Sequence, residues 1–418
     1  MEQQFLQNGY ELVENSEYAD IYIINTCTVT NIAERKSRQM IRRSKQLNEK
    51  AIIVVCGCYV EVSKEEVENL QEVDIVLNDK EKKSIVKYVE EFIKNIYKTN
   101  NEDIENKNEF VEYGSVTFTE KNRAVIKIQD GCNMFCSYCI IPYARGRIRS
   151  RDIKNIIEEI EKISQKGIKE VVLTGIHIAS YGKDIEDNKI ELIDLLEKIN
   201  TIEGIERIRL GSLEPTIITE DFLNRLIKLE KICHHFHLSL QSGCNSTLKR
   251  MNRKYTTEQF KEICNLLRKA YKDVILTTDI IVGFPGETEE EFETTYNFLN
   301  DISFYKMHVF KYSSRKGTVA AKMPNQIDGN IKEERSKKLI KLSNNNQNKY
   351  NELYLENKLK VLFEEIENGY IKGHTSNYIE VKAEIKNIDN PDKLINQIID
   401  VKITKKDDKT MELIGEIV

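Results

Sequence analysis

The sequence predicts an α/β protein in three parts: a parallel α/β domain at the amino end, an open barrel of six β/α units, and a small β-barrel at the carboxyl end. Two patterns lead to this prediction. As far as about residue 345, short β-branched runs alternate with amphipathic helical stretches, which is typical of parallel sheets. Beyond that point, apolar and polar residues alternate singly, as in antiparallel strands. A chain of 418 residues has room for about three domains.

The first domain is predicted to span residues 1–96. Its three strand candidates are short apolar runs separated by periodic helical stretches, at residues 20–26, 51–56 and 74–78. This alternation indicates a parallel sheet. Residues 97–122 are polar and rich in Asn, Glu and Lys, and we interpret them as a linker.

The second domain is predicted at residues 123–345. Six further strand candidates occur there, mostly separated by amphipathic helical stretches, at residues 124–129, 170–175, 207–212, 235–240, 274–283 and 304–312. Six units are too few for a closed eight-stranded barrel, but they fit an open partial barrel. In such folds the chemistry gathers at the carboxyl ends of the strands.

The third domain is predicted at residues 346–418. It contains five segments in which apolar and polar residues alternate, at residues 359–365, 370–373, 378–383, 398–404 and 411–418. Several short strands of period two in a stretch this small predict an all-β barrel.

The amino terminus lacks the basic start, apolar centre and small-residue cleavage site of a signal peptide. No apolar run approaches the ~18 residues of a membrane span. We therefore expect a cytoplasmic protein with no membrane partner. Its nine cysteines should be reduced there, and an odd number fits metal ligation or free thiols better than a disulfide framework.

The net charge of −5 argues against a nucleic-acid binder, but the charge is unevenly distributed. Residues 31–50 carry seven basic side chains against two acidic ones, whereas residues 61–81 are acidic. A polarised surface can attract a polyanion locally while the whole molecule stays soluble. The alternative is a solvated helix face.

A cysteine-rich loop follows the first strand of the predicted barrel directly. Cys132, Cys136 and Cys139 have the spacing Cys-x3-Cys-x2-Cys. Three thiolates on one tight loop can bind three irons of a cubane and leave the fourth iron open to a reactant. A structural zinc ion would need a fourth ligand nearby, and none follows within the loop. The alternatives are three free thiols or a zinc ion completed by a distant histidine.

These cysteines match the signature of the radical S-adenosylmethionine (SAM) enzymes, and the six-unit count resembles the partial barrel of that superfamily. The resemblance implies a [4Fe–4S] cluster on Cys132, Cys136 and Cys139 that cleaves SAM reductively. The resulting 5′-deoxyadenosyl radical would abstract hydrogen from a C–H bond, while the protein positions and shields the reactants.

Further strings resemble one family within this superfamily, the methylthiotransferases. They are CSYCIIPYARGRIRSR at residues 136–151, NTCTVT at residues 25–30, and Gly57-Cys58-Tyr59. The strings NTCTVTN, IPYARGR and LTGIHIASYG are similar to those of enzymes acting on N6-threonylcarbamoyladenosine in tRNA. The resemblance covers essentially the whole chain. It implies a methylthiotransferase domain at the amino end, a radical SAM domain, and a terminal TRAM-type barrel that binds RNA.

The activity that this resemblance implies is tRNA modification. One SAM would methylate a sulfur at a second cluster, and another would yield the radical that removes hydrogen from C2 of N6-threonylcarbamoyladenosine beside the anticodon. Partners would be tRNA and a reductase or flavodoxin-type electron donor. Alternatives are a methylthiotransferase acting on a ribosomal-protein aspartate or on isopentenyladenosine in tRNA. A non-enzymatic RNA-binding protein is a further alternative, against which the intact cysteine loop argues.

In this family the second [4Fe–4S] cluster is held by three cysteines of the first domain. Cys27 and Cys58 match two of them, each at the end of a predicted strand. The family's first ligand lies upstream of Met1. We expect either that the chain begins late or that Cys56, which would share a strand face with Cys58, takes part instead. We favour a late start, because a sheet without its first strand would have an open apolar edge.

The candidate cofactor contacts at the strand ends are Thr174, Gly175, Ser239, Gln241, Asp279, Gly283 and Pro285. The resemblance implies this role for Thr174, Gly175 and the turn at residues 283–287, whereas Ser239, Gln241 and Asp279 are chosen from their positions on the strands. Ser239 and Gln241 could equally form a polar turn, and Asp279 either faces the barrel interior or caps a backbone group. The superfamily's usual acidic pair after the glycine is absent, since Ile176 and His177 stand there. A zinc site formed by Cys233, His235, His237 and Cys244 is conceivable.

Two groups of basic residues suggest contacts with RNA. Four arginines alternate just after the cysteine loop: Arg145, Arg147, Arg149 and Arg151. On an extended segment they would share one face, and that face would suit the binding of tRNA phosphates or of the threonyl carboxylate. The alternative is ion pairing with local carboxylates such as Asp152. The resemblance implies that lysines of the terminal barrel contact the RNA backbone: Lys360, Lys372, Lys382, Lys402, Lys405 and Lys406.

Overall fold

The computed structural model describes residues 1–94, 110–112, 122–185, 190–386, 388–407 and 409–418. By packing, the chain forms two compact units. The first unit contains residues 1–118, 130–149 and 313–322, and the second contains residues 119–129, 150–312 and 323–418. Most of the predicted linker lies outside the described residues, and the predicted domain boundaries stay a prediction.

The first unit is built on a three-stranded parallel sheet of order β1-β2-β3, formed by Ile21–Thr26, Ile52–Gly57 and Ile75–Leu77. All three strands lie where the apolar runs predict them. Helices cover both faces, and their bounds are α1 Glu2–Gln7, α2 Asn31–Leu47, α3 Cys58–Glu68 and α4 Ile85–Ile93. Side chains of α2 and α3 pack on one face, and those of α1 and α4 pack on the other. Double coverage explains why the strands are apolar on both sides.

Two segments from much later in the chain complete this unit. Residues 130–149 include the short helix α5 (Ile141–Ala144), and the backbone of Ala320 donates a hydrogen bond to the Ser137 carbonyl at 2.8 Å. Arg315 is buried and donates hydrogen bonds to Thr28 and Glu34, at the start of α2. Polar contacts of this kind join parts of the chain that are far apart in sequence.

The second unit contains an open barrel of six parallel strands. Their bounds are β4 Arg123–Asp130, β6 Glu170–Gly175, β7 Arg207–Leu210, β8 His235–Gln241, β9 Ile275–Val282 and β10 Lys306–Lys311. They form two sheets of order β5-β4-β6-β7 and β10-β9-β8, with β5 (Arg149–Ser150) at one edge. Isolated parallel bridges, Ile208 to Ile232 and Leu213 to Leu238, join the two sheets. The six-unit partial barrel is therefore confirmed.

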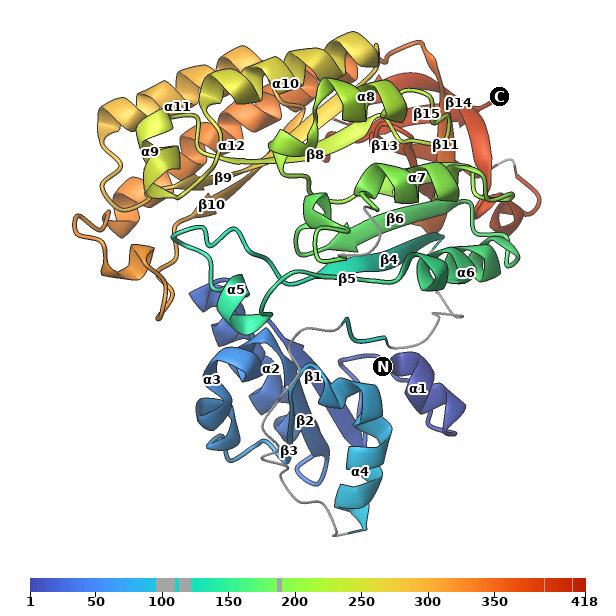
Figure 1. Ribbon diagram of the computed structural model, residues 1–418. Helices are drawn as coiled ribbons and strands as arrows, with labels where there is room; N and C mark the ends of the chain where they lie inside the picture. The colour runs from blue at the N-terminus through green and yellow to red at the C-terminus, as the bar shows by residue number, and fades with distance from the viewer. Residues whose placement is uncertain (95–109, 113–121, 186–189, 387, 408) are drawn as a thin grey trace. The chain divides into compact units, whose positions relative to one another are not determined.

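Amphipathic helices cover the outside of this barrel (Figure 1), with bounds α6 Ile153–Ser164, α7 Leu192–Asn200, α8 Glu220–Leu226, α9 Asn245–Arg250, α10 Thr257–Ala270, α11 Glu289–Ile302 and α12 Gly329–Glu352. Three of these described helices begin with reciprocal side-chain caps, Glu191 with Asp194, Thr256 with Gln259, and Thr288 with Glu291. Their apolar faces and the strands share one core. No described helix is both long and apolar enough to cross a membrane.

The chain ends in a closed five-stranded barrel of order β11-β12-β13-β15-β14, which confirms the predicted small β-barrel. The strands are Lys358–Glu367, Tyr370–Thr375, Glu380–Glu384, Ile398–Lys406 and Leu413–Ile417. Alternate residues of these strands form its core, as the period-two pattern requires.

Buried ion pairs attach this small barrel to the amino ends of β6 and β7. The Glu170 carboxylate is buried and accepts a hydrogen bond from Arg209 at 2.7 Å, and Arg207 lies 3.7 Å from it. Burial alone would raise the pKa of Glu170, but the two guanidinium groups outweigh it and lower that pKa. Both arginines also donate to backbone carbonyls of the small barrel, including those of His374 and Ser376. The attachment thus lies at the opposite strand ends from those where chemistry is expected.

Candidate active site

The three cysteines of the predicted cluster loop follow β4 in one tight turn of the first unit. Cys132 is buried, whereas Cys136 and Cys139 are partly exposed. The backbone of Cys139 donates to the Cys136 carbonyl at 3.0 Å, and the backbone of Met134 donates to Cys132 Sγ at 3.4 Å. A glycine is required before the first cysteine: Gly131 has φ +69°, and a Cβ there would lie 1.8 Å from the Arg147 carbonyl oxygen.

This loop fits an iron–sulfur cubane in the number and chemistry of its donors. A cubane takes one thiolate on each iron, so its ligands lie farther apart than the ligands of a single ion. In the described part of the chain, no three His, Cys, Asp or Glu side chains are gathered tightly enough to hold one metal ion. The same finding argues against zinc on the set Cys233, His235, His237 and Cys244.

The two cysteines predicted for a second cluster also lie in the first unit, at the carboxyl ends of adjacent strands. Cys27 directly follows β1 and is exposed, and Cys58 is the buried first residue of α3. Gly57 has φ +101°, and a Cβ there would lie 2.3 Å from the Thr26 carbonyl oxygen. This glycine therefore lets the turn before Cys58 pass against the end of β1.

The expectation that Cys56 and Cys58 share one strand face is wrong, because β2 ends at Gly57 and Cys58 already belongs to α3. Cys56 points into the apolar cluster under α1 and α4, and its burial raises the pKa of its thiol. A thiol in this environment resists ionisation, so Cys56 is a poor thiolate ligand.

Arg145 links the Cys58 turn to the cluster loop within the first unit. Its Nε donates to Cys58 Sγ at 3.2 Å, and its Nη1 lies 2.6 Å from Asp79 and 3.8 Å from Asp130, which directly precedes the loop. Lys82 and Arg149 pair with the same two carboxylates. Burial alone would lower the pKa of Arg145, but the neighbouring sulfur and carboxylates raise it. The result is a row of alternating charges that spans both cysteine regions.

The prediction that four arginines share one face after the cysteine loop is wrong. Arg145 follows helix α5 and pairs as described, Arg149 is buried against Asp130, and Arg151 is buried against Glu159. Arg147 is exposed, with its guanidinium 4.8 Å from the centre of the Phe135 ring. Ion pairing with carboxylates, the alternative to RNA contact, therefore holds for three of the four.

Arg145→Met is expected to loosen the cluster loop, because it removes the cation shared by Asp79 and Asp130. Breaking one side of a buried ion pair costs about 3 kcal/mol. Hydrogen–deuterium exchange of apo-protein should show faster amide exchange in residues 130–149, with Arg145→Lys intermediate. Arg147→Met, which removes an exposed arginine from the same loop, is the matched control. Equal exchange in the Met variants would show that Arg145 does not hold the loop.

The second unit gathers polar groups at the carboxyl ends of β6, β7 and β8. Thr174 and Gly175 end β6, and a Cβ on Gly175 would lie 2.8 Å from the Gln129 carbonyl oxygen. Ser239 Oγ, near the end of β8, is 2.6 Å from Ser212 Oγ, which follows β7. Four of the predicted cofactor contacts thus lie at the carboxyl ends of β6 and β8, the strands on either side of β7: Thr174, Gly175, Ser239 and Gln241.

Gln241 has φ +75°, which is unusual for a residue with a side chain. The pairing of β8 with β9 shifts register just before it. Strained backbone of this kind persists only where the surrounding structure enforces it, and it is common at functional sites. A polar turn adopts the same geometry, and the site role of Gln241 stays a prediction.

The remaining predicted contacts lie on β9 and in the turn after it. The Asp279 carboxylate is 3.2 Å from His237 Nε2, a cross-strand ion-pair distance. Gly283 has φ +69°, and its backbone N–H donates to the buried Glu287 carboxylate at 2.6 Å. Arg335 in turn donates to Glu287, and Pro285 is buried in the turn. This hydrogen-bonded turn accounts for Gly283 structurally, and cofactor contact there stays a prediction.

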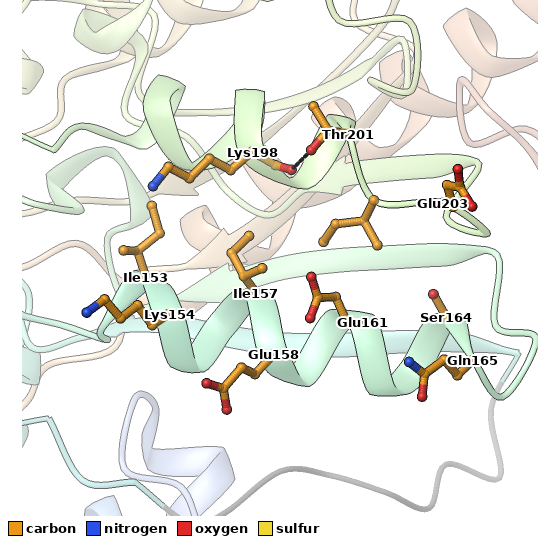
Figure 2. A pocket seen from close by; sticks show the side chains of 11 residues that line it. Ile153, Lys154, Ile157, Glu158, Glu161, Ser164, Gln165, Lys198, Thr201 and Glu203 are labelled. Atoms are coloured by element: carbon orange, nitrogen blue, oxygen red, sulfur yellow. Dashed lines mark hydrogen bonds between the residues drawn. The ribbon is translucent and has the colours of Figure 1, made fainter.

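A cavity of about 780 Å³ lies elsewhere, between α6 and the end of α7 (Figure 2). Its lining mixes acidic side chains such as Glu158 and Glu161 with Lys198, and it extends to Glu203, just before β7. It therefore lies on the outer helices towards the amino ends of the strands. We assign it no role in the chemistry.

Sequence patterns did not reveal several polar residues of these regions. From the sequence, Arg145 was treated only as one of four alternating arginines. No pattern in the sequence marked Arg253 or Arg315 as a functional residue. Glu214 had a usable signal, because it lies a few residues after the carboxyl end of β7. A carboxylate at such a position is a candidate ligand contact.

Comparisons with known proteins agree with this picture. The chain matches the family model of the radical SAM superfamily at residues 126–299 and that of the uncharacterized protein family UPF0004 at residues 1–78. It is 41% identical to a threonylcarbamoyladenosine tRNA methylthiotransferase MtaB of Bacillus subtilis, over 96% of this chain and 89% of that protein. It is also 37% identical to a tRNA-2-methylthio-N(6)-dimethylallyladenosine synthase of Clostridium tetani, over 95% and 88%.

Among solved structures, the chain resembles the radical SAM methyltransferase TsrM of Kitasatospora setae, with a TM-score of 0.53 and 15% identity over 73% of this chain and 66% of that one. At this identity the likeness shows the fold alone. It supports the partial barrel seen here.

Proposed function

We propose, from the premise that this chain belongs to the family of radical SAM tRNA methylthiotransferases, that its substrate is N6-threonylcarbamoyladenosine beside the anticodon of tRNA. The product would be 2-methylthio-N6-threonylcarbamoyladenosine. The observation that carries the choice is the 41% identity, over nearly full length, to relatives named for threonylcarbamoyladenosine. Relatives named for dimethylallyladenosine reach 41% identity over 80% of the chain and 39% over 94%, so that nucleoside is the second candidate.

Cys132, Cys136 and Cys139 would hold a [4Fe–4S] cluster that, with SAM bound, supplies a 5′-deoxyadenosyl radical for hydrogen abstraction at C2. The chain itself positions and shields these reactants. Gly131 shapes the loop, and Arg145 holds it against the Cys58 turn. The polar strand ends of β6 and β8 would bind and orient the cofactor and the nucleoside.

A second [4Fe–4S] cluster on Cys27 and Cys58 belongs to this proposal. The two cysteines directly follow adjacent strands, and Arg145 donates a hydrogen bond to Cys58. A further ligand would be needed to complete three thiolates. The cluster chemistry also calls for an electron donor of the reductase or flavodoxin type, and for a cytoplasmic location where tRNA is available.

The first unit offers a surface suited to RNA. Arg35, Lys36 and Arg43 are exposed on α2, which begins just after the Cys27 loop. The lysines expected to bind RNA on the small barrel are mostly engaged instead: carboxylates lie within ion-pair distance of Lys360, Lys372, Lys382, Lys402 and Lys406. Of the two surfaces, α2 has the more available positive charge for phosphates.

The proposal is tested with reconstituted protein, SAM, a strong reductant and two anticodon stem-loop RNAs, one carrying threonylcarbamoyladenosine and one dimethylallyladenosine. Mass spectrometry of the digested nucleosides should show a methylthio product from the first RNA. Product from the second RNA alone would transfer the assignment to dimethylallyladenosine. Cleavage of SAM with product from neither would point to another target, such as a ribosomal-protein aspartate.

A further inference from the structure

Two buried side-chain atoms that have no hydrogen-bond partner among the described residues lie near each other, just after the carboxyl ends of β6 and β7. They are His177 Nε2 and Glu214 Oε1. The Glu214 side chain is 4% exposed and that of His177 is 13% exposed. His177 Nε2 is 3.9 Å from Glu214 Oε2, too far for a hydrogen bond between them.

Glu214 is fixed in place by contacts on one side only. It follows β7 and directly precedes the turn Pro215–Ile217. Its Oε2 accepts a hydrogen bond from Arg253 Nη2 at 2.6 Å, and the same nitrogen donates to the Ser239 carbonyl at 2.9 Å. Arg253 thereby offsets the charge of the carboxylate and ties it to the end of β8, while Oε1 keeps its lone pairs unused.

His177 is also held on one side. Its backbone N–H donates to Gln129 Oε1 at 2.7 Å, and the Nδ1 atom of its imidazole ring lies 2.5 Å from Ser180 Oγ. In the tautomer that carries its hydrogen on Nδ1, Ser180 Oγ accepts that hydrogen and Nε2 is an acceptor. The side chains of His177 and Glu214 then present two acceptors to the same region.

A buried carboxylate oxygen without a donor is costly, so native structures seldom leave one without a partner such as water, an ion or a ligand. Here the unused acceptors lie among the strand ends where ligands of partial barrels bind. The neighbouring residues Thr174, Gly175 and Ser239 are predicted cofactor contacts. Two convergent acceptors suit a group with more than one hydrogen to donate, above all an ammonium.

We propose that His177 and Glu214 form a subsite for a hydrogen-bond donor of a small polar ligand, an inference that rests on the proposed function. Two reactants of that function carry such a group. SAM has an α-ammonium, and the threonylcarbamoyl substituent has N–H and O–H groups. The subsite has the same chemistry in either case, and the experiment separates the two sources.

The test uses Glu214→Gln, which keeps an acceptor for Arg253 but removes the charge, in the reconstituted holoenzyme. SAM affinity is measured by equilibrium dialysis without RNA, and kcat and KM are measured for the threonylcarbamoyl-modified stem-loop. We expect about tenfold weakening of one ligand, as loss of a charge-assisted hydrogen bond implies. Weaker SAM binding identifies the ammonium, whereas a raised RNA KM with unchanged SAM affinity identifies the nucleoside.

His177→Gln is the second variant, and it tests the subsite if Glu214→Gln fails to fold. Glu220→Gln, an exposed carboxylate at the start of α8, is the matched control. Iron content and thermal unfolding check that each variant is intact. Unchanged SAM affinity and RNA kinetics in both subsite variants would overturn the proposal and leave the proposed function standing. If the wild-type protein binds SAM but modifies neither RNA, the proposed function is rejected. The measurement of SAM affinity in the variants would still test the subsite.

Discussion

Cys136→Ala is expected to remove about four irons per chain and to abolish the methylthiolated product, because a cubane held by three thiolates does not survive on two. The wild-type protein should hold about eight irons with both clusters formed and about four with one. Iron analysis and absorption spectroscopy of anaerobically reconstituted protein measure the first effect. Nucleoside mass spectrometry measures the second, as a fall below detection.

RNA binding separates the loss of a cluster from a general loss of structure. Fluorescence anisotropy with the stem-loop RNA should give nearly the same affinity for Cys136→Ala as for the wild type. Cys264→Ala is the matched control, since Cys264 is fully buried in the barrel core, far in sequence from the loop. A full iron complement in Cys136→Ala, or an equal loss of iron in Cys264→Ala, would contradict the assignment of the cluster loop.

Gly131→Ala is expected to have an effect almost as large, for a reason that lies in the backbone. The added Cβ would lie 1.8 Å from the Arg147 carbonyl oxygen, so the loop must move by more than an ångström. The left-handed backbone adds about 1–2 kcal/mol. We expect poor incorporation of the cluster and a loss of product of more than about 100-fold, since small displacements at a reacting centre are costly.

Gly146→Ala provides a matched control in the same loop. Gly146 has φ +75°, close to that of Gly131, but a Cβ there would meet only the flexible end of the Arg149 side chain, at 3.4 Å. It therefore carries the left-handed strain without the backbone collision. Iron content and product should stay near wild type in Gly146→Ala and fall in Gly131→Ala. Similar behaviour of the two variants would show that the loop adapts to the Cβ.

The structure changes which basic residues we expect to contact RNA. The sequence pattern suggested RNA contacts for the arginines after the cysteine loop, and the family resemblance implied them for lysines of the small barrel. In the folded protein most of these side chains have carboxylate partners, for example Arg151 with Glu159 and Lys382 with Glu412. The partners come from other elements, which periodicity within one segment cannot reveal.

Secondary structure was highly predictable, and the reason is local. In the described part of the chain, the β-branched runs of the first domain and the barrel and the period-two segments of the terminal domain marked every strand longer than two residues. The exception is β5, a two-residue strand at a sheet edge, which is too short to carry a pattern. The cysteine loop was also visible, because its three ligands are separated by only a few residues of chain.

The sequence alone therefore determined the order of elements, the partial barrel with its cysteine loop, and the small terminal barrel, since periodicity and spacing act over short stretches of chain. Only the tertiary structure decided that Cys56 is buried in an apolar cluster while Cys58 meets Arg145, and that Glu214 lies near His177. Each of these contacts joins residues on different elements. Burial then sets their chemistry, because a charged or polar group removed from water depends on whichever partner the fold brings to it.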